Sequence, residues 1–250
     1  STPDRLCQAA TRDCPEPQPI PPVRVPDIDT EPELSPALSL YIPVGFGADK
    51  NTLFASGTYQ ASVREDPGSV ATGGIGIGLG NADELAGLEL SYAFETSDDF
   101  GDGAFNAKLH RRFGRDWAAA VGWNGFLNVS RNDFEHSLYG TVTTVVRTAE
   151  DIDTPFSRLA VTVGAGNNQF RSNGSVDAGE NNFNVFGNVA ARVARPVSAI
   201  VEWTGQDLAI GASVTPFRNI PIAITPALRD IAGAGDGPRF TIGVGTAFRL

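Results

Sequence analysis

The sequence predicts an all-β protein: a transmembrane, antiparallel, up-and-down β-barrel of about twelve strands. Three observations support this class. Apolar and polar residues alternate in segments of about ten residues, the length that a tilted membrane strand needs. Short turns and longer polar loops alternate between these segments. The chain also shows no apolar run of the roughly 18 residues that a membrane helix requires, and its mean hydropathy is -0.10.

Twelve segments are expected to form the strands. They cover residues 52–64, 70–80, 85–96, 103–113, 117–129, 137–147, 157–169, 182–193, 197–205, 207–215, 220–230 and 239–250. An even number of strands lets both termini of the barrel chain lie on one side of the membrane. Two connections, at residues 148–156 and 205–206, do not follow the alternation of short turns and long loops.

The outer face is expected to be apolar. In residues 117–129, Trp117, Val121 and Trp123 share one face, while Phe126 breaks the pattern, as Phe186 does in residues 183–193. Aromatic residues also gather near strand ends, which is typical of the interfacial girdles of membrane barrels. The expected girdle residues are Phe94, Phe113, Trp117, Phe170, Trp203 and Phe248. A soluble β-sandwich or lipocalin-like barrel also alternates, but these aromatics and the repeated Gly, Ser, Thr, Asn and Arg on the other face favour a membrane barrel with a wet lumen.

The N-terminal 36 residues differ from the rest. They hold nine of the 17 prolines, so they are interpreted as a polyproline-II segment that precedes a barrel domain at residues 37–250. Cys7 and Cys14 are close in sequence and are expected to form a small disulfide loop in an oxidising compartment. The missing initiator methionine suggests a removed leader, as export would require.

Residues 37–47 alternate like a further strand, with Leu38, Leu40 and Ile42 on one face. A thirteenth strand would put the two termini on opposite sides of the membrane, and Pro43 cannot donate to a sheet ladder. The segment is therefore expected at the rim of the barrel or inside it, with a fourteen-strand barrel as the alternative.

Several strings carry a family resemblance. They are KLHRR at residues 108–112, VEWTGQDL at 201–208, PFRNIP at 216–221 with ITP at 224–226, and GDGPRF at 235–240. They resemble a family of uncharacterised cyanobacterial outer-membrane β-barrel proteins, over most of residues 37–250. The resemblance implies the barrel fold and the bacterial outer membrane, and it implies nothing about a solute.

Charged residues on the polar face are the candidate functional residues. If the apolar face meets lipid, a set of mostly basic residues lines the lumen. The set is Arg64, Glu89, Lys108, His110, Arg112, Arg147, Arg158, Arg192, Glu202, Arg229, Arg239 and Arg249. Guanidinium groups in a low-dielectric wall attract anions. The alternative is that these residues form structural ion pairs, and the sequence does not decide between the two.

Other chemistries find little support. The net charge of -10 argues against nucleic acid. Asp98, Asp99 and Asp102 lack the spacing of a calcium loop, and neither a metal site nor a cofactor is expected. A lipid hydrolase would have to use His110 or the pair His136 and Ser137, so no enzymatic activity is expected.

The expected function is a porin-like channel for small hydrophilic solutes, with anions as the finer possibility. The alternative is a structural or secretion-associated barrel that is plugged by its N-terminal segment. The expected partners are outer-membrane lipid and a periplasmic protein that binds this segment. The oligomeric state does not follow from the sequence.

Overall fold

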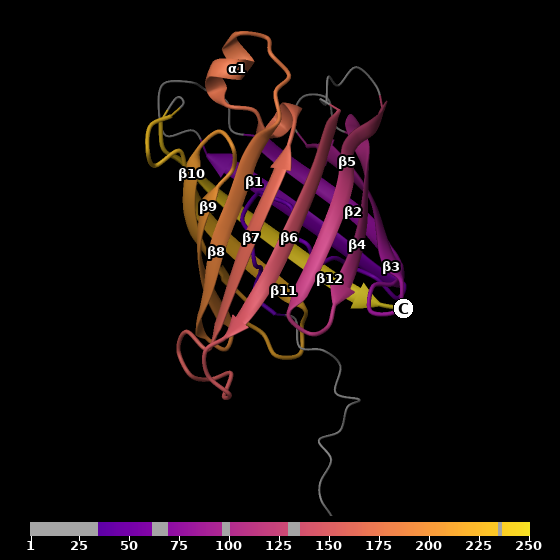
Figure 1. The fold of residues 1–250 in the computed structure, drawn as a ribbon, viewed down its shortest axis with the longest axis vertical. Coiled ribbons are helices and arrows are strands. Elements are labelled where there is room, and N and C mark those ends of the chain that lie inside the picture. The colour runs from indigo at the N-terminus through magenta and orange to yellow at the C-terminus, as the bar shows by residue number, and fades with distance from the viewer. Residues whose placement is uncertain (1–34, 62–69, 97–100, 130–135, 235–236) are drawn as a thin grey trace, which may run out of the picture. The chain divides into compact units, whose positions relative to one another are not determined.

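The computed structural model describes residues 35–61, 70–96, 101–129, 136–234 and 237–250. Within the unit Glu33–Leu250, twelve antiparallel strands form a closed barrel in which each strand pairs with its neighbours in sequence (Figure 1). The predicted fold class and the count of twelve strands, rather than fourteen, are confirmed.

The strand bounds lie close to the expected ones. The elements are β1 (Thr52–Ala61), β2 (Val70–Asn81), β3 (Ala86–Glu95), β4 (Gly103–Phe113), β5 (Trp117–Val129), β6 (Ser137–Arg147), β7 (Arg158–Gly166), the 3-10 helix η3 (Asn168–Phe170), α1 (Asn173–Asp177), β8 (Asn184–Ala194), β9 (Val197–Trp203), β10 (Leu208–Val214), β11 (Ile222–Arg229) and β12 (Arg239–Arg249).

The first and last strands close the barrel. Their register runs from the pair Thr52 and Arg249 to the pair Ala61 and Phe240. We call the end where β1 begins and β12 stops the terminal end, and the opposite end the loop end. Because the closure leaves no open sheet edge, every strand has a neighbour on both sides.

The connections differ at the two ends. At the loop end, η3 and α1 stand between β7 and β8, whereas β9 and β10 are joined by a tight turn in which the Thr204 N–H donates to the Asp207 carbonyl at 3.0 Å. At the terminal end the turns are short, except for residues 148–157 between β6 and β7 and residues 215–221 between β10 and β11. In the part of the chain that is described, no helix has both the length and the apolarity to cross a membrane.

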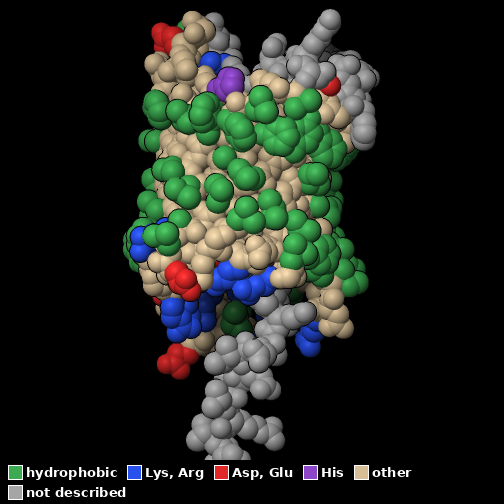
Figure 2. Space-filling view, turned by 90° about the vertical axis from the view of Figure 1, so that its right-hand side faces the viewer, with side chains coloured by type: hydrophobic (Ala, Val, Ile, Leu, Met, Phe, Trp, Pro, Cys, Tyr) green, Lys and Arg blue, Asp and Glu red, His purple; other side chains and the backbone are tan. Residues whose placement is uncertain are grey.

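The side chains alternate between two environments. In β6, Val142 is 46% exposed on the outer face while Thr143 is fully buried inside. Figure 2 shows that hydrophobic side chains cover a broad band of the outer face, with charged side chains gathered below it. Water-exposed apolar surface of this extent is unfavourable, so the band is suited to contact with lipid.

A bulge explains the exception at Phe126. Gly125 adopts a φ of 68°, a left-handed conformation that favours glycine, and its N–H donates to the Asn106 side chain at 2.8 Å. The register between β4 and β5 shifts at this point. The Phe126 ring lies 6.3 Å from each of the outward rings of Phe105 and Trp123, so Phe126 joins the outer aromatic residues.

Candidate functional site in the barrel lumen

Residues 35–51 run through the barrel to the rim at its terminal end, where Lys50 pairs with Asp83, and we call them the luminal segment. The N–H of Ala37 donates to Ser213 near the terminal end of β10, and the N–H of Tyr41 donates to Glu202 nearer the loop end of β9. The chain then turns back, and the Gly45 N–H donates to Thr143 of β6 at 2.8 Å. The segment therefore enters the lumen, turns within it, and returns to the terminal end, where β1 begins.

Glu202 anchors the turning point of this segment. Its carboxylate is fully buried and accepts the backbone N–H groups of Leu40, Tyr41 and Ile42 at 2.8, 2.6 and 3.0 Å. The side-chain amide of Asn188 donates to the same carboxylate at 3.1 Å and to the Leu38 carbonyl at 2.7 Å. A buried carboxylate is costly without partners. Three of its four donors come from the luminal segment, so the carboxylate holds the segment in place and the segment stabilises the buried carboxylate.

An apolar cluster holds the same stretch from the other side. Ile42 packs in one buried cluster with Tyr139, Phe170 and Phe186, and the rings of Phe170 and Phe186 stack at 4.4 Å. The expectation that Phe170 belongs to the interfacial girdle is therefore wrong, because its ring is 2% exposed and covers Ile42. Phe186 breaks the strand pattern for the same reason: it points inward toward the luminal segment.

The returning part of the segment runs tightly along the wall. A Cβ on Gly45 would lie 2.3 Å from the Ala118 carbonyl oxygen, so only glycine fits there. The Lys108 ammonium donates to the Phe46 carbonyl at 2.6 Å, and the His110 ring nitrogen Nε2 lies 2.9 Å from the Ala48 carbonyl. His110 is 1% exposed, which makes it a packed structural group of the wall.

A pocket of about 330 Å³, lined by polar and apolar side chains, lies in the lumen beside this segment. Its lining comes mostly from β3, β4 and β5, with one residue each from β1, β6 and η3. The lining residues are Phe54, Glu89, Ser91, Ala93, Asn106, Ala107, Lys108, Asn124, Gly125, Tyr139 and Gln169. Glu89 and Lys108 also bond to the luminal segment, so they mark the part of the pocket nearest to it.

Three expected lumen residues lie at the terminal end in structural contacts. Arg112 pairs with Asp49 at 3.3 Å and with Asp83 at 2.9 Å. Arg147 pairs with Asp116 at 2.7 Å, and Arg158 donates to the carbonyls of the residue 148–157 turn, including Ala149 at 2.7 Å. A hydrogen bond from Lys50 holds the pKa of the Asp83 carboxyl, in the β2–β3 turn, below its usual range.

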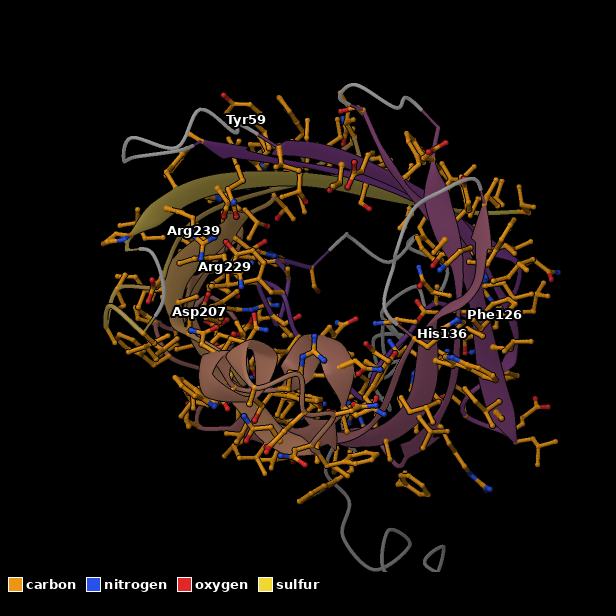
Figure 3. The ribbon with its side chains drawn as sticks, turned by 90° about the horizontal axis from the view of Figure 1, so that it is seen from above. Tyr59, Phe126, His136, Asp207, Arg229 and Arg239 are labelled. Atoms are coloured by element: carbon orange, nitrogen blue, oxygen red, sulfur yellow. The ribbon has the colours of Figure 1, made fainter. Side chains whose placement is uncertain are left out.

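Two other arginines face the lumen near the loop end. Figure 3 shows Arg229 and Arg239 beside Asp207 on the inner side of one wall. Arg229 donates to Asp207 from Nη2 at 2.9 Å and lies 4.7 Å from the centre of the Tyr41 ring. Burial raises the pKa of the Tyr41 hydroxyl, which also bonds to Thr241. Arg239 makes no ion pair with any residue that the structure describes, and its Nε is buried without a partner there.

The remaining expected residues divide into two groups. Arg192 lies on the inward side of β8 and its Nε is buried without a partner among the described residues, while Arg249 is exposed at the end of β12. Arg64, the cysteines Cys7 and Cys14, and the acidic residues Asp98 and Asp99 lie outside the described residues.

The candidate hydrolase residues do not come together. Ser137 is fully buried on the inner face of β6 and accepts the Gln169 N–H at 3.1 Å. The His136 ring lies 6.2 Å from Trp123, whose ring is on the outer face. In the described part of the chain, no group of three or more His, Cys, Asp or Glu residues could hold a metal ion.

Sequence reasoning missed the amide groups of the pocket. Asn106, Asn124 and Gln169 carry no motif, and Gln169, expected at the end of the strand 157–169, lies in η3 instead. Two signals point to them in retrospect. Asn106 and Asn124 fall on the inward positions of β4 and β5, and the exception at Phe126 marks the bulge beside them.

Comparisons with known proteins give a fold likeness only. No protein-family model matches the chain, and no curated protein matches it. Among solved structures, the chain is similar to the Acinetobacter baumannii outer membrane protein Omp33, with 8% sequence identity and a TM-score of 0.42, over 80% of this chain and 98% of that chain. The resemblance to a cyanobacterial family therefore stays a prediction.

Proposed function

We propose that the protein is a porin-like barrel of the bacterial outer membrane that lets small hydrophilic solutes pass. The outer band of apolar side chains supports a membrane location, since closed barrels and helices are the structures that satisfy all backbone groups in lipid. With the terminal end in the periplasm, the longer loops would lie outside, as in outer-membrane barrels. Outer-membrane lipid is then the first partner of this surface.

The luminal pocket of about 330 Å³ is the observation that carries the transport part of the proposal. A twelve-stranded barrel has a narrow lumen that side chains and one inserted peptide largely fill. The luminal segment runs along β8, β9 and β10 on its way in and along β3 to β6 on its way back, and the pocket lies beside the returning part, between β3, β4 and β5. The pathway would therefore be narrow and suited to small solutes.

A preference for anions is the finer part of the proposal. It is supported by Arg239, which has no ion pair among the residues described, next to the paired Arg229. Most other expected cations are neutralised by acids or bound to backbone carbonyls, as Arg112, Arg147 and Arg158 are. Any preference would thus arise from Arg239 near the loop end and Arg192 near the terminal end, which make no ion pair with a described residue.

The buried anchoring of Glu202 favours a second candidate function, a plugged structural barrel. In that case the luminal segment closes the lumen and carries residues 1–34 to a periplasmic partner. A segment held by a buried carboxylate and an apolar cluster is suited to this role. No catalytic step belongs to either proposal.

Planar-bilayer recording separates the two candidates. The purified full-length chain is added to a lipid bilayer in potassium chloride, with detergent alone as the control. The channel proposal expects discrete current steps of small amplitude, because the pathway is narrowed by the luminal segment. Bilayers that contain folded protein and stay silent would reject the channel and favour the plugged barrel.

A further inference from the structure

We propose that the luminal pocket is a binding site for a small uncharged polyol, such as a monosaccharide. The inference rests on the proposed channel function and deepens it, because it names the solute class that would occupy the pathway. The pocket volume of about 330 Å³ falls at the small end of the roughly 300–1,000 Å³ that small-molecule sites span.

The pocket offers polar groups with hydrogen-bonding capacity to spare. Asn124 donates its amide to the Gln169 side-chain carbonyl at 2.9 Å, which leaves the Asn124 oxygen and the Gln169 amino group without a partner among the residues described. The Asn106 oxygen accepts the Gly125 N–H, and the Asn106 amino group has no partner within the described ranges. The hydroxyls of Ser91 and Tyr139 complete a set of neutral donors and acceptors that suits the hydroxyls of a polyol.

The charges of the pocket cancel one another. Glu89 and Lys108 form an ion pair at 2.8 Å, with side chains that are 18% and 14% exposed. Their other bonds go to the luminal segment, since Glu89 accepts the Ala48 N–H at 2.9 Å and Lys108 donates to the Phe46 carbonyl at 2.6 Å. Lys108 is therefore already neutralised, and the pocket presents no uncompensated charge to an anionic or cationic ligand.

Phe54 supplies an apolar surface beside these groups. Its ring rests on the wall at Gly76, where a Cβ would come within 2.3 Å of the ring. Pockets that bind small molecules combine such apolar faces with a few placed polar groups. A sugar ring has the matching character, with C–H groups on its faces and hydroxyls around its edge.

Equilibrium binding on the full-length protein in detergent tests the site without requiring conduction. Isothermal titration with D-glucose is expected to show weak saturable binding, roughly millimolar for a ligand of this size. D-glucose 6-phosphate should bind no more tightly than glucose. Absence of saturable glucose binding, or tighter binding of the phosphate ester, would overturn the proposal.

Paired variants assign the binding to the pocket. Replacing Asn124→Ala and Gln169→Ala together removes groups that bond to each other through their side chains, and it should weaken glucose binding by about tenfold or more, the loss of one to two net hydrogen bonds. Asn182→Ala, at an exposed asparagine before β8, is the control and should leave binding unchanged within twofold. If the double variant binds glucose as tightly as the Asn182→Ala control, the sugar binds elsewhere and the proposed site is wrong.

The outcomes for the site and the channel are distinguishable. Current steps without glucose binding would keep the channel and reject the polyol site. Glucose binding by a barrel that never conducts would keep the site and reject the channel.

Discussion

The Glu202 carboxylate on β9 accepts the backbone N–H of Tyr41 at 2.6 Å, which joins the barrel wall to a segment 161 residues earlier in the chain. The two neighbouring N–H groups of the segment point to the same carboxylate. One buried side chain thus fixes where the luminal segment turns, and with it how much of the lumen the segment fills.

Replacing Glu202→Gln should destabilise the barrel. In the wild type, backbone N–H groups donate to both carboxylate oxygens. A glutamine replaces one of these oxygens with an NH₂ donor, so at least one buried N–H loses its acceptor, and an unsatisfied buried group costs about 1–3 kcal/mol. Urea unfolding of the protein in lipid vesicles, followed by tryptophan fluorescence, measures the loss. Asp116→Asn is the control: its partner Arg147 is 39% exposed, so the effect should stay below about 0.5 kcal/mol. Equal effects of the two changes would mean that Glu202 does not anchor the segment.

Gly45→Ala should loosen the luminal segment. The new Cβ would lie 2.3 Å from the Ala118 carbonyl oxygen and 3.0 Å from the Thr143 nitrogen. Overpacking of this kind costs about 1–3 kcal/mol, so hydrogen exchange at the N–H groups of Leu40 and Tyr41 should speed up roughly tenfold. Gly140→Ala is the matched control, because its Cβ would meet nothing closer than 3.9 Å. Unchanged exchange in Gly45→Ala would contradict the close fit of segment and wall.

Phe170→Ala should be strongly destabilising, although Phe170 lies in a connection between strands. The change removes a ring that is 2% exposed and stacks on Phe186, and such deletions cost about 3–5 kcal/mol. Phe183→Ala removes a ring that is 66% exposed and should cost less than about 0.5 kcal/mol. The same unfolding assay compares them, and similar small losses would argue that Phe170 contacts lipid after all.

Arg239→Gln should reduce any preference for chloride over potassium. Arg239 faces the lumen near the loop end and makes no ion pair with a described residue, and a unit charge at about 4 Å contributes roughly 1 kcal/mol in water, so the permeability ratio should fall by up to about fivefold. Reversal potentials in a salt gradient measure the ratio. Arg147→Gln, whose partner Asp116 lies at the terminal end, should leave it unchanged. A ratio that is the same in wild type and Arg239→Gln would remove the anionic part of the proposal.

The barrel wall could be predicted from the sequence because alternation is a local signal. Each strand shows lipid every second residue, so residues such as Val142 and Thr143 report their own faces without any tertiary information. The departures at Phe126 and Phe186 were also visible. Their causes, a bulge at Gly125 and an inward contact with Ile42, depend on partners far away in sequence.

The interior of the lumen could be predicted only in part. Inward positions of charged residues follow from strand parity, but their partners do not, because Glu202 bonds to a segment and Arg112 to turns that are distant in sequence. Charge counting therefore overstated the free positive charge of the lumen. The neutral amides of the pocket went unnoticed because isolated asparagine and glutamine residues on a strand carry no recognisable motif.

Tryptophan quenching by brominated lipid tests the membrane-spanning barrel most directly. All three tryptophans, Trp117, Trp123 and Trp203, lie on the outer face with 52%, 46% and 39% of their surface exposed. In vesicles whose acyl chains carry bromine, their fluorescence should be strongly quenched relative to the same vesicles without bromine. Emission of equal intensity in both kinds of vesicle would mean that these rings do not touch acyl chains, and the account of an outer-membrane barrel would be wrong.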